Sequence, residues 1–182
     1  MRQKRAQTGR RERHRRHEVR VRRDGGTRHI GENRWPDAKD KWETLKGQAV
    51  FHYIGSLQTN KAKDVVGRFD YIHSLDRLSL AAAIDKRAQA LQLRVPCFLQ
   101  VNISGEASKH GMAPEDVRAF IRGLRDYPAI DPIGLMTMAP LDTDPEQARP
   151  VFRALRELRD ELNREALTQR PLTELSMGMS GD

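Results

Sequence analysis

The stretch VFHYIGSLQTNKAKDVVGRFDYIH, residues 50–73, is the part of the sequence that decides the fold. Its two ends, Val50–Ile54 and Tyr71–His73, are short, mostly apolar and bounded by Gly or Asp, which is typical of buried parallel strands. The segment between them, Leu57–Val66, is predicted to form a helix. A strand, a helix and a second strand in this order indicate a parallel α/β fold.

The same alternation extends from about residue 27 to the end of the chain. Six strands are predicted, at Arg28–Gly31, Val50–Ile54, Tyr71–His73, Cys97–Ile103, Pro132–Met138 and Glu174–Met177. Five helices are predicted between them, opening at Pro36, over Leu57–Val66, after Asp76 as N-cap, at Pro114 and at Asp144-Pro145. Pro150 falls inside the fifth helix and is expected to cause a kink or a fresh start.

Two architectures are compatible with this alternation. A TIM (β/α)8 barrel has eight strands, so six strands would form an incomplete barrel. An open sheet is the alternative on counting alone. No Gly-x-Gly-x-x-Gly and no Gly-Lys-Ser/Thr follows a predicted strand, so no nucleotide fingerprint supports a Rossmann or P-loop fold.

The basic residues are concentrated at the start of the chain. Residues 1–23 contain eleven Lys and Arg against two acidic residues, whereas the rest has 22 basic and 23 acidic residues. We expect residues 1–25 to be an atypical Arg-rich tail, disordered or loosely helical, and residues 26–182 to form the folded domain. The abrupt change near Asp24 suggests the hypothesis of a reading-frame shift or a wrong start in the coding sequence. The near-neutral domain argues against a basic groove.

The remaining composition points to a cytoplasmic protein. Apolar residues make up 37% of the chain, and no run approaches the ~18 residues of a membrane span. The N-terminus has no apolar segment of the secretory type. The single cysteine, Cys97, lies in an apolar stretch and is predicted to be a buried core thiol.

Small or polar residues stand at the ends of several predicted strands. The segments that contain them include Asn33, His52, Asn102, Met136, Ser176 and Ser180. In a barrel, ligands bind at these ends, and serine hydroxyls with free N–H groups can hold a phosphate without a metal. Each residue also has an ordinary structural explanation: a core histidine, a methionine that fills the core, or a turn residue.

Five ordered motifs carry a resemblance to a known family. They are Gly31-Glu32-Asn33, His52–Lys61 (HYIGSLQTNK), Val101–Glu106 (VNISGE) with Lys109-His110-Gly111, Gly134–Thr137 (GLMT) and Leu175–Ser180 (LSMGMS). Together they resemble the signature of the pyridoxal phosphate homeostasis proteins, the YggS/PROSC family, from about Gly26 to Asp182. The resemblance implies a single-domain TIM barrel similar to the N-terminal domain of alanine racemase. It also implies binding of pyridoxal 5′-phosphate (PLP) and a role in cofactor homeostasis without an established catalytic reaction.

The resemblance also implies roles for five residues. Asn33 and His52 would face the cofactor ring from strand ends, and Met136 would pack near the ring. Ser176 and Ser180 would lie near the phosphate. The family further implies a monomer.

One part of the family pattern is not found. In the family, the first strand ends in a Ser/Thr-Lys motif whose lysine forms the Schiff base, but the corresponding region here is Arg10–His14. Arginine does not substitute, because it stays protonated and non-nucleophilic. The family also continues beyond Asp182, through an eighth strand. We therefore expect a barrel without its first and last strands, no covalent cofactor attachment, and open edges that favour aggregation or a partner.

Two other functions are alternatives to PLP binding without catalysis. A PLP-dependent amino-acid racemase would need the Schiff-base lysine and a second acid/base group, and the sequence supplies neither. Nucleic-acid binding would rest on the Arg-rich tail alone, which predicts salt-dependent binding without sequence specificity. The leading hypothesis is a non-catalytic PLP-binding protein.

Overall fold

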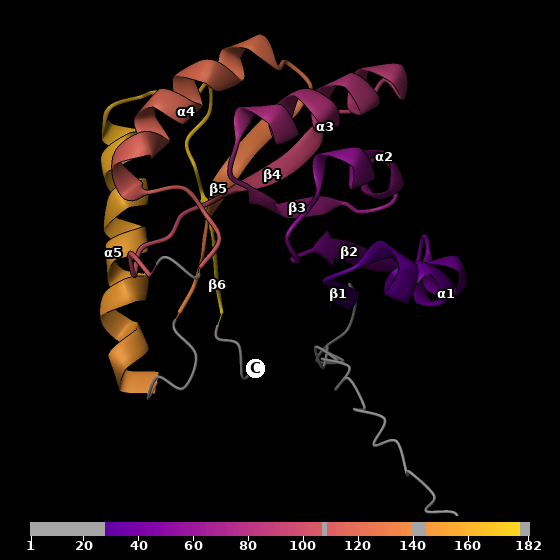
Figure 1. The fold of residues 1–182 in the computed structure, drawn as a ribbon, viewed down its shortest axis with the longest axis horizontal. Helices are drawn as coiled ribbons and strands as arrows, with labels where there is room; N and C mark the ends of the chain where they lie inside the picture. Colours follow the sequence, from indigo (N-terminus) through magenta and orange to yellow (C-terminus); the bar gives the residue numbers. More distant parts are fainter. Residues whose placement is uncertain (1–27, 107–108, 140–144, 179–182) are drawn as a thin grey trace, which may run out of the picture.

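A computed structural model describes residues 28–106, 109–139 and 145–178 (Figure 1). The strands are β1 (Arg28–Glu32), β2 (Ala49–Tyr53), β3 (Tyr71–Leu75), β4 (Val95–Gln100), β5 (Ile130–Met138) and β6 (Glu174–Gly178). The α-helices are α1 (Trp35–Leu45), α2 (Ala62–Val65), α3 (Leu78–Ala90), α4 (Val117–Gly123) and α5 (Pro145–Arg164). Three short 3-10 helices are η1 (Thr59–Lys61), η2 (Pro114–Asp116) and η3 (Leu124–Asp126). None of the described helices combines the length and the hydropathy of a membrane span.

The order of the strands decides the architecture. They follow one another as β1-β2-β3-β4-β5-β6, and each neighbouring pair is parallel. A doubly wound sheet reverses its strand order at a switch point, whereas consecutive order is that of a (β/α)8 barrel. The helices lie around the outside of the curled sheet (Figure 1). The prediction of an incomplete TIM barrel with six strands is therefore confirmed, with β1 and β6 as the outer strands of the described sheet.

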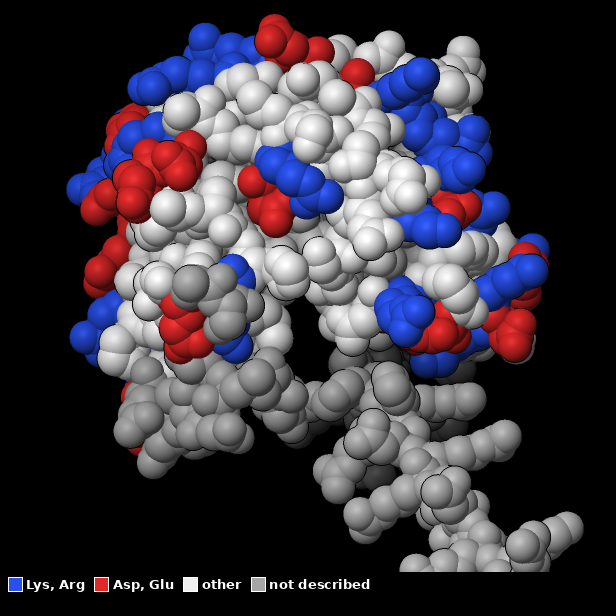
Figure 2. Space-filling view, viewed as in Figure 1, with Lys and Arg blue, Asp and Glu red and all other residues white. Residues whose placement is uncertain are grey.

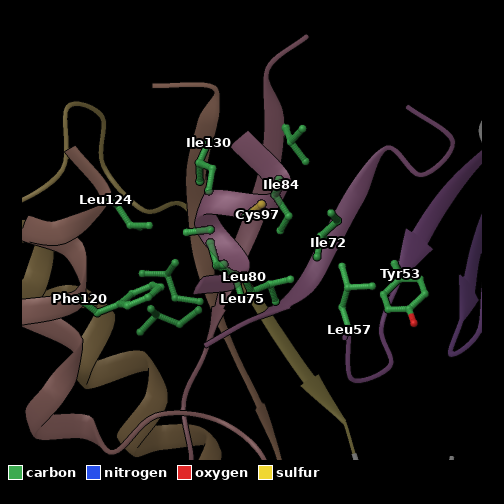
Figure 3. Close-up of a cluster of buried hydrophobic side chains, with 14 of the residues drawn as sticks. Tyr53, Leu57, Ile72, Leu75, Leu80, Ile84, Cys97, Phe120, Leu124 and Ile130 are labelled. Carbon is green, nitrogen blue, oxygen red and sulfur yellow. The ribbon is translucent and has the colours of Figure 1, made fainter. Parts of the chain in front are cut away.

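The main hydrophobic core lies between the sheet and the helices. Figure 3 shows side chains from β3, α3 and α4 in this layer, including Ile72, Ile84 and Phe120. Cys97 of β4 lies among them and is fully buried. Burial raises the pKa of its thiol well above the usual range, because the interior disfavours the thiolate. The prediction of a core thiol is thus confirmed.

Two predicted helices differ from the structure at their N-terminal ends. The predicted helix over Leu57–Val66 is wrong in its first turn, because the buried Leu57 precedes an extended Gln58 and the chain coils only from η1. The predicted N-cap Asp76 is also wrong, since Arg77 occupies that position. Instead of capping α3, Asp76 binds the guanidinium of Arg77 with 2.6 Å between Oδ1 and Nη1.

Two further features differ in part from the prediction. The helix α5 continues through Pro150 without a fresh start. Proline costs only one backbone hydrogen bond there, close to the N-terminal end of a 20-residue helix. The fourth strand ends at Gln100 and not at Ile103, because the Gln100 carbonyl accepts a bond from the returning Met112 N–H. The Arg-rich tail and Asp144 lie outside the described residues.

Candidate functional site

The two faces of the sheet differ in polarity. Side chains alternate along each strand, so Ile30, Phe51 and Ile72 pack against the helices while their neighbours point to the hollow inside of the curled sheet. The inward set includes three histidines on adjacent strands, His29 of β1, His52 of β2 and His73 of β3. In the space-filling view the molecule is hollowed between the part that contains α5 and the part that contains α1 (Figure 2). Charged side chains gather mainly on the outer surface.

These histidines form a continuous hydrogen-bonded line that ends on β6. Nδ1 of His29 lies 2.9 Å from Nε2 of His52, and Nδ1 of His52 lies 2.8 Å from Nε2 of His73. Nδ1 of His73 lies 2.8 Å from Oγ of Ser176. We call these four residues the histidine–serine line. Its last contact crosses the concave face from β3 to β6 and joins residues that are 103 positions apart in the sequence. This contact is possible only because the sheet curls.

Aromatic neighbours hold the two inner imidazoles in place. Tyr71 stacks on His52 with ring centroids 4.7 Å apart and planes 13° from parallel. Phe98 of β4 stacks on His73 at 4.1 Å and 21°. Such stacking restricts ring rotation, so the nitrogen atoms stay directed along the line.

Burial keeps the inner histidines neutral. The pKa of His52 is lowered to about 4, mainly by loss of hydration and also by the neighbouring His29, while Asp70 acts in the opposite direction. Burial likewise lowers the pKa of His73 to about 3, with a smaller contribution from His52. At neutral pH each inner ring therefore carries one N–H donor and one acceptor nitrogen.

The structure brings together some of the predicted site residues. His52 and Ser176 belong to the same line, connected through His73. Met136 of β5 is only 3% exposed, lies outside the outer core layer and pairs in register with Ser176. Asn33 follows β1 with an exposed side chain, and its backbone approaches Gly55 after β2 so closely that a Cβ there would overlap the Asn33 carbonyl. Ser180 lies outside the described residues.

The loop after β4 is built around Asn102. Its amide donates to the Glu106 carbonyl at 2.8 Å, and its side-chain oxygen accepts bonds from the Ser104 hydroxyl and the Gly105 N–H. The turn-forming interpretation of Asn102 is thus confirmed. Lys109, later in the loop, reaches the Ala139 carbonyl just beyond β5, with 3.4 Å between nitrogen and oxygen.

Sequence reasoning missed His73 and Phe98. His73 had a signal, because His29, His52 and His73 occupy inward positions of three consecutive predicted strands. Alternation alone would have placed them on one face of the sheet. This pattern was not decisive, because it does not predict that the sheet curls and brings Ser176 of β6 into contact with His73.

Two observations bear on which ligand the site could hold and on where the site lies. Among the described residues, no group of three or more His, Cys, Asp or Glu side chains is arranged to hold a metal ion. A cavity of about 560 Å³, lined by Arg94, Leu124 and Ile130 among others, lies at the amino ends of β4 and β5. In barrels of this kind the chemistry is at the carboxyl ends, so we place the candidate site on the concave face and not in that cavity.

The class of the protein follows from its parallel half-barrel and from a comparison with known families. The profile of the family "Alanine racemase, N-terminal domain" matches residues 14–182, and the chain belongs to this family. The match begins within the Arg-rich segment.

Within that class the chain is a member of the pyridoxal phosphate homeostasis proteins. It is 44% identical to the protein of that name from Aquifex aeolicus over 158 residues, which are 86% of this chain and 68% of the relative. The Synechocystis protein of the same name is 36% identical over 159 residues, 86% of this chain and 72% of that one. The chain thus spans about two thirds of the length of these relatives.

Solved structures support the same placement. PipY of Synechococcus elongatus, solved with PLP bound, has a TM-score of 0.75 and 38% identity, over 85% of this chain and 72% of PipY. Alanine racemase of Clostridium difficile has a TM-score of 0.64 but 12% identity, over 83% of this chain and 43% of the racemase. The second likeness is one of fold alone.

Proposed function

We propose that this chain binds PLP reversibly on the concave face of the half-barrel and serves PLP homeostasis without a catalytic reaction of its own. The single observation that carries the proposal is the inward line ending on Ser176, in a fold whose relative PipY was solved with PLP bound. The curated relatives are named for PLP homeostasis, which supports the non-catalytic part.

The residues present suit part of the cofactor. Ser176 offers a hydroxyl whose one described partner is the neutral imidazole of His73, and its proton is available to a phosphate oxygen when Nδ1 of His73 is the donor in that contact. Met136 pairs in register with Ser176 and Phe98 stacks on His73, so apolar side chains flank the serine. PLP supplies an aldehyde that reacts with amines, but the two lysines of the family motifs, Lys61 and Lys109, are poorly placed for it. Lys61 is exposed in η1, and the Lys109 amine contacts a backbone carbonyl.

We therefore expect binding without a covalent bond at a defined lysine. The role of the chain's own residues is to hold and orient the ligand: Ser176 by hydrogen bonding, Met136 by packing, and His52 with His73 by fixing the serine. Asn33 and Ser180 complete the proposed set from the loops after β1 and β6. We also propose a cytoplasmic protein.

The test is a titration of the full chain with PLP, followed by dialysis and by borohydride reduction with peptide mass spectrometry. Binding should be saturable, reversed by dialysis, and weaker for pyridoxal, which lacks the phosphate. Ser176→Ala should weaken binding about tenfold, the equivalent of losing a ~1.4 kcal/mol charge-assisted bond. Ser79→Ala, on the exposed face of α3, is the matched control and should bind like the parent.

Two results would contradict the proposal. Stoichiometric reduction of PLP onto Lys61 or Lys109 would show a defined covalent site. Equal affinity of the parent and Ser176→Ala would remove Ser176 from the site.

A further inference from the structure

The histidine–serine line has a property that an ordinary packed core does not have. Each histidine contact joins two imidazole nitrogens, Nδ1 of one ring and Nε2 of the next. A hydrogen bond between two nitrogens needs one proton between them, so one ring donates and the other accepts. The line is therefore ordered in one of two directions, and its rings cannot choose their tautomers independently.

The first direction runs toward Ser176. If His29 donates from Nδ1, His52 accepts at Nε2 and must donate from its own Nδ1 to His73. His73 then donates from Nδ1 to the Ser176 oxygen, which leaves the serine hydroxyl proton free for a ligand. All three neutral rings are then Nδ1–H tautomers.

The second direction runs away from Ser176. The serine hydroxyl donates to Nδ1 of His73, and His73 and His52 each donate from Nε2 to the next ring. All three rings are then Nε2–H tautomers. Ser176 can only accept a hydrogen bond from a ligand in this state, so an oxyanion finds no donor on it.

Protonation of His29 selects between the two directions. His29 is exposed, whereas the inner rings are buried and stay neutral. A doubly protonated His29 presents Nδ1–H to His52, which is compatible only with the direction toward Ser176. In the opposite direction two N–H groups would face each other across 2.9 Å.

We propose that His29, His52 and His73 form a tautomer relay that couples proton uptake at His29 to oxyanion binding at Ser176. His52 and His73 act as positioning residues that set the donor direction of the serine hydroxyl. This inference rests on the proposed function, since it specifies the ligand chemistry of the same site: an oxyanion such as a phosphate, and not a hydrogen-bond donor.

Few other titratable groups face the relay in the described residues. Asp70, between β2 and β3, exerts an electrostatic effect on His52, but its carboxylate accepts the Phe51 N–H at 2.7 Å and does not interrupt the line. The phenol ring of Tyr71 stacks on His52 without a hydrogen bond to it. On β4 and β6 the groups facing His73 are the uncharged Phe98 and Ser176.

The first test reads the tautomers directly. Nitrogen-15 NMR of the full chain at about pH 7.5 distinguishes Nδ1–H from Nε2–H imidazoles, and His→Gln variants assign the signals among the six histidines. The relay predicts that His29, His52 and His73 share one tautomer and move together to Nδ1–H when sulfate is added. A mixed pattern, or no sulfate-dependent change at His73, would overturn it.

The second test measures sulfate affinity at about pH 8 and at about pH 6, a range over which sulfate keeps its charge and histidine is the side chain that ordinarily changes charge. If the two directions are equally populated without ligand, protonation should raise the affinity about twofold, and more if the reverse direction predominates. His29→Gln keeps a donor but cannot be protonated, so it should lose this gain. His110→Gln, on the exposed loop after β4, should retain it.

The outcomes separate this inference from the proposed function. Concerted tautomers with no PLP binding would overturn the proposed function and leave the relay standing. PLP binding with the same pH dependence in His29→Gln as in the parent would overturn the relay and leave the proposed function standing.

Discussion

Asp85 offers a direct test of how the half-barrel is held together. It lies in the middle of α3 and is only 6% exposed. One carboxylate oxygen accepts the Ala129 N–H at 2.8 Å, immediately before β5, and the other accepts from Gln89 at 2.5 Å. The Ala129 carbonyl in turn accepts the Val95 N–H at the start of β4. Asp85 thus connects α3 to the entry of two neighbouring strands.

The loss of stability expected for Asp85→Ala follows from the partners that the substitution leaves without an acceptor. The buried Ala129 N–H loses its partner, and an unsatisfied buried donor costs about 1–3 kcal/mol. The bond to the exposed Gln89 adds little. For a domain of this size the loss corresponds to a fall of about 2–12 °C in Tm, at about 2–4 °C per kcal/mol. Asp85→Asn keeps one acceptor oxygen for Ala129, so it should lose less than half as much.

Urea unfolding followed by circular dichroism measures these differences. Asp126→Ala in η3 is the matched control, because this aspartate is exposed and has no partner within the described residues. Its stability should stay close to that of the parent. If Asp85→Ala unfolds at the same urea concentration as Asp126→Ala, the bond to Ala129 does not contribute as the structure indicates.

Three further predictions concern the sheet and the site. The pKa values of His52 and His73 in the folded chain lie below that of unfolded histidine, so the unfolded chain binds more protons. The free energy of unfolding should therefore fall as pH drops from about 6.5 toward 4. Urea midpoints should depend less on pH when both His52 and His73 are replaced by Gln. Gly134→Ala should destabilise strongly, since its Cβ would overlap the backbone of β6, whereas Gly178→Ala meets only ordinary contacts and should be nearly neutral in the same unfolding assay. Cys97 should react with a thiol reagent only in denaturant, and rapid labelling of the native chain would disprove its burial.

Much of the fold could be predicted from local sequence because its signals are local. All six strands were found from short apolar runs between Gly, Pro and Asp, and the helix openings at Pro36 and Pro114 followed from the preference of proline for a first helical turn. The errors at Leu57 and Asp76 have a common cause. A tertiary contact, burial in one case and a neighbouring guanidinium in the other, displaced the local preference.

The candidate site could be predicted only in part. His52, Met136 and Ser176 were each predicted from their places at strand ends and from a family resemblance. The structure shows that His52 and Ser176 belong to one hydrogen-bonded line. His73 was missed because its role depends on Ser176, which is 103 positions away. No local pattern reports a contact of that kind.

The sequence by itself determined the alternating strands and helices, the neutral domain, and the absence of a recognisable Ser/Thr-Lys motif before the second predicted strand. Those properties depend on composition and periodicity, which each segment carries independently of its neighbours. Only the tertiary structure decided that the strands lie in consecutive order and curl, because strand order is set by packing between distant segments. The same curling brings His73 of β3 to Ser176 of β6 and so creates the concave site.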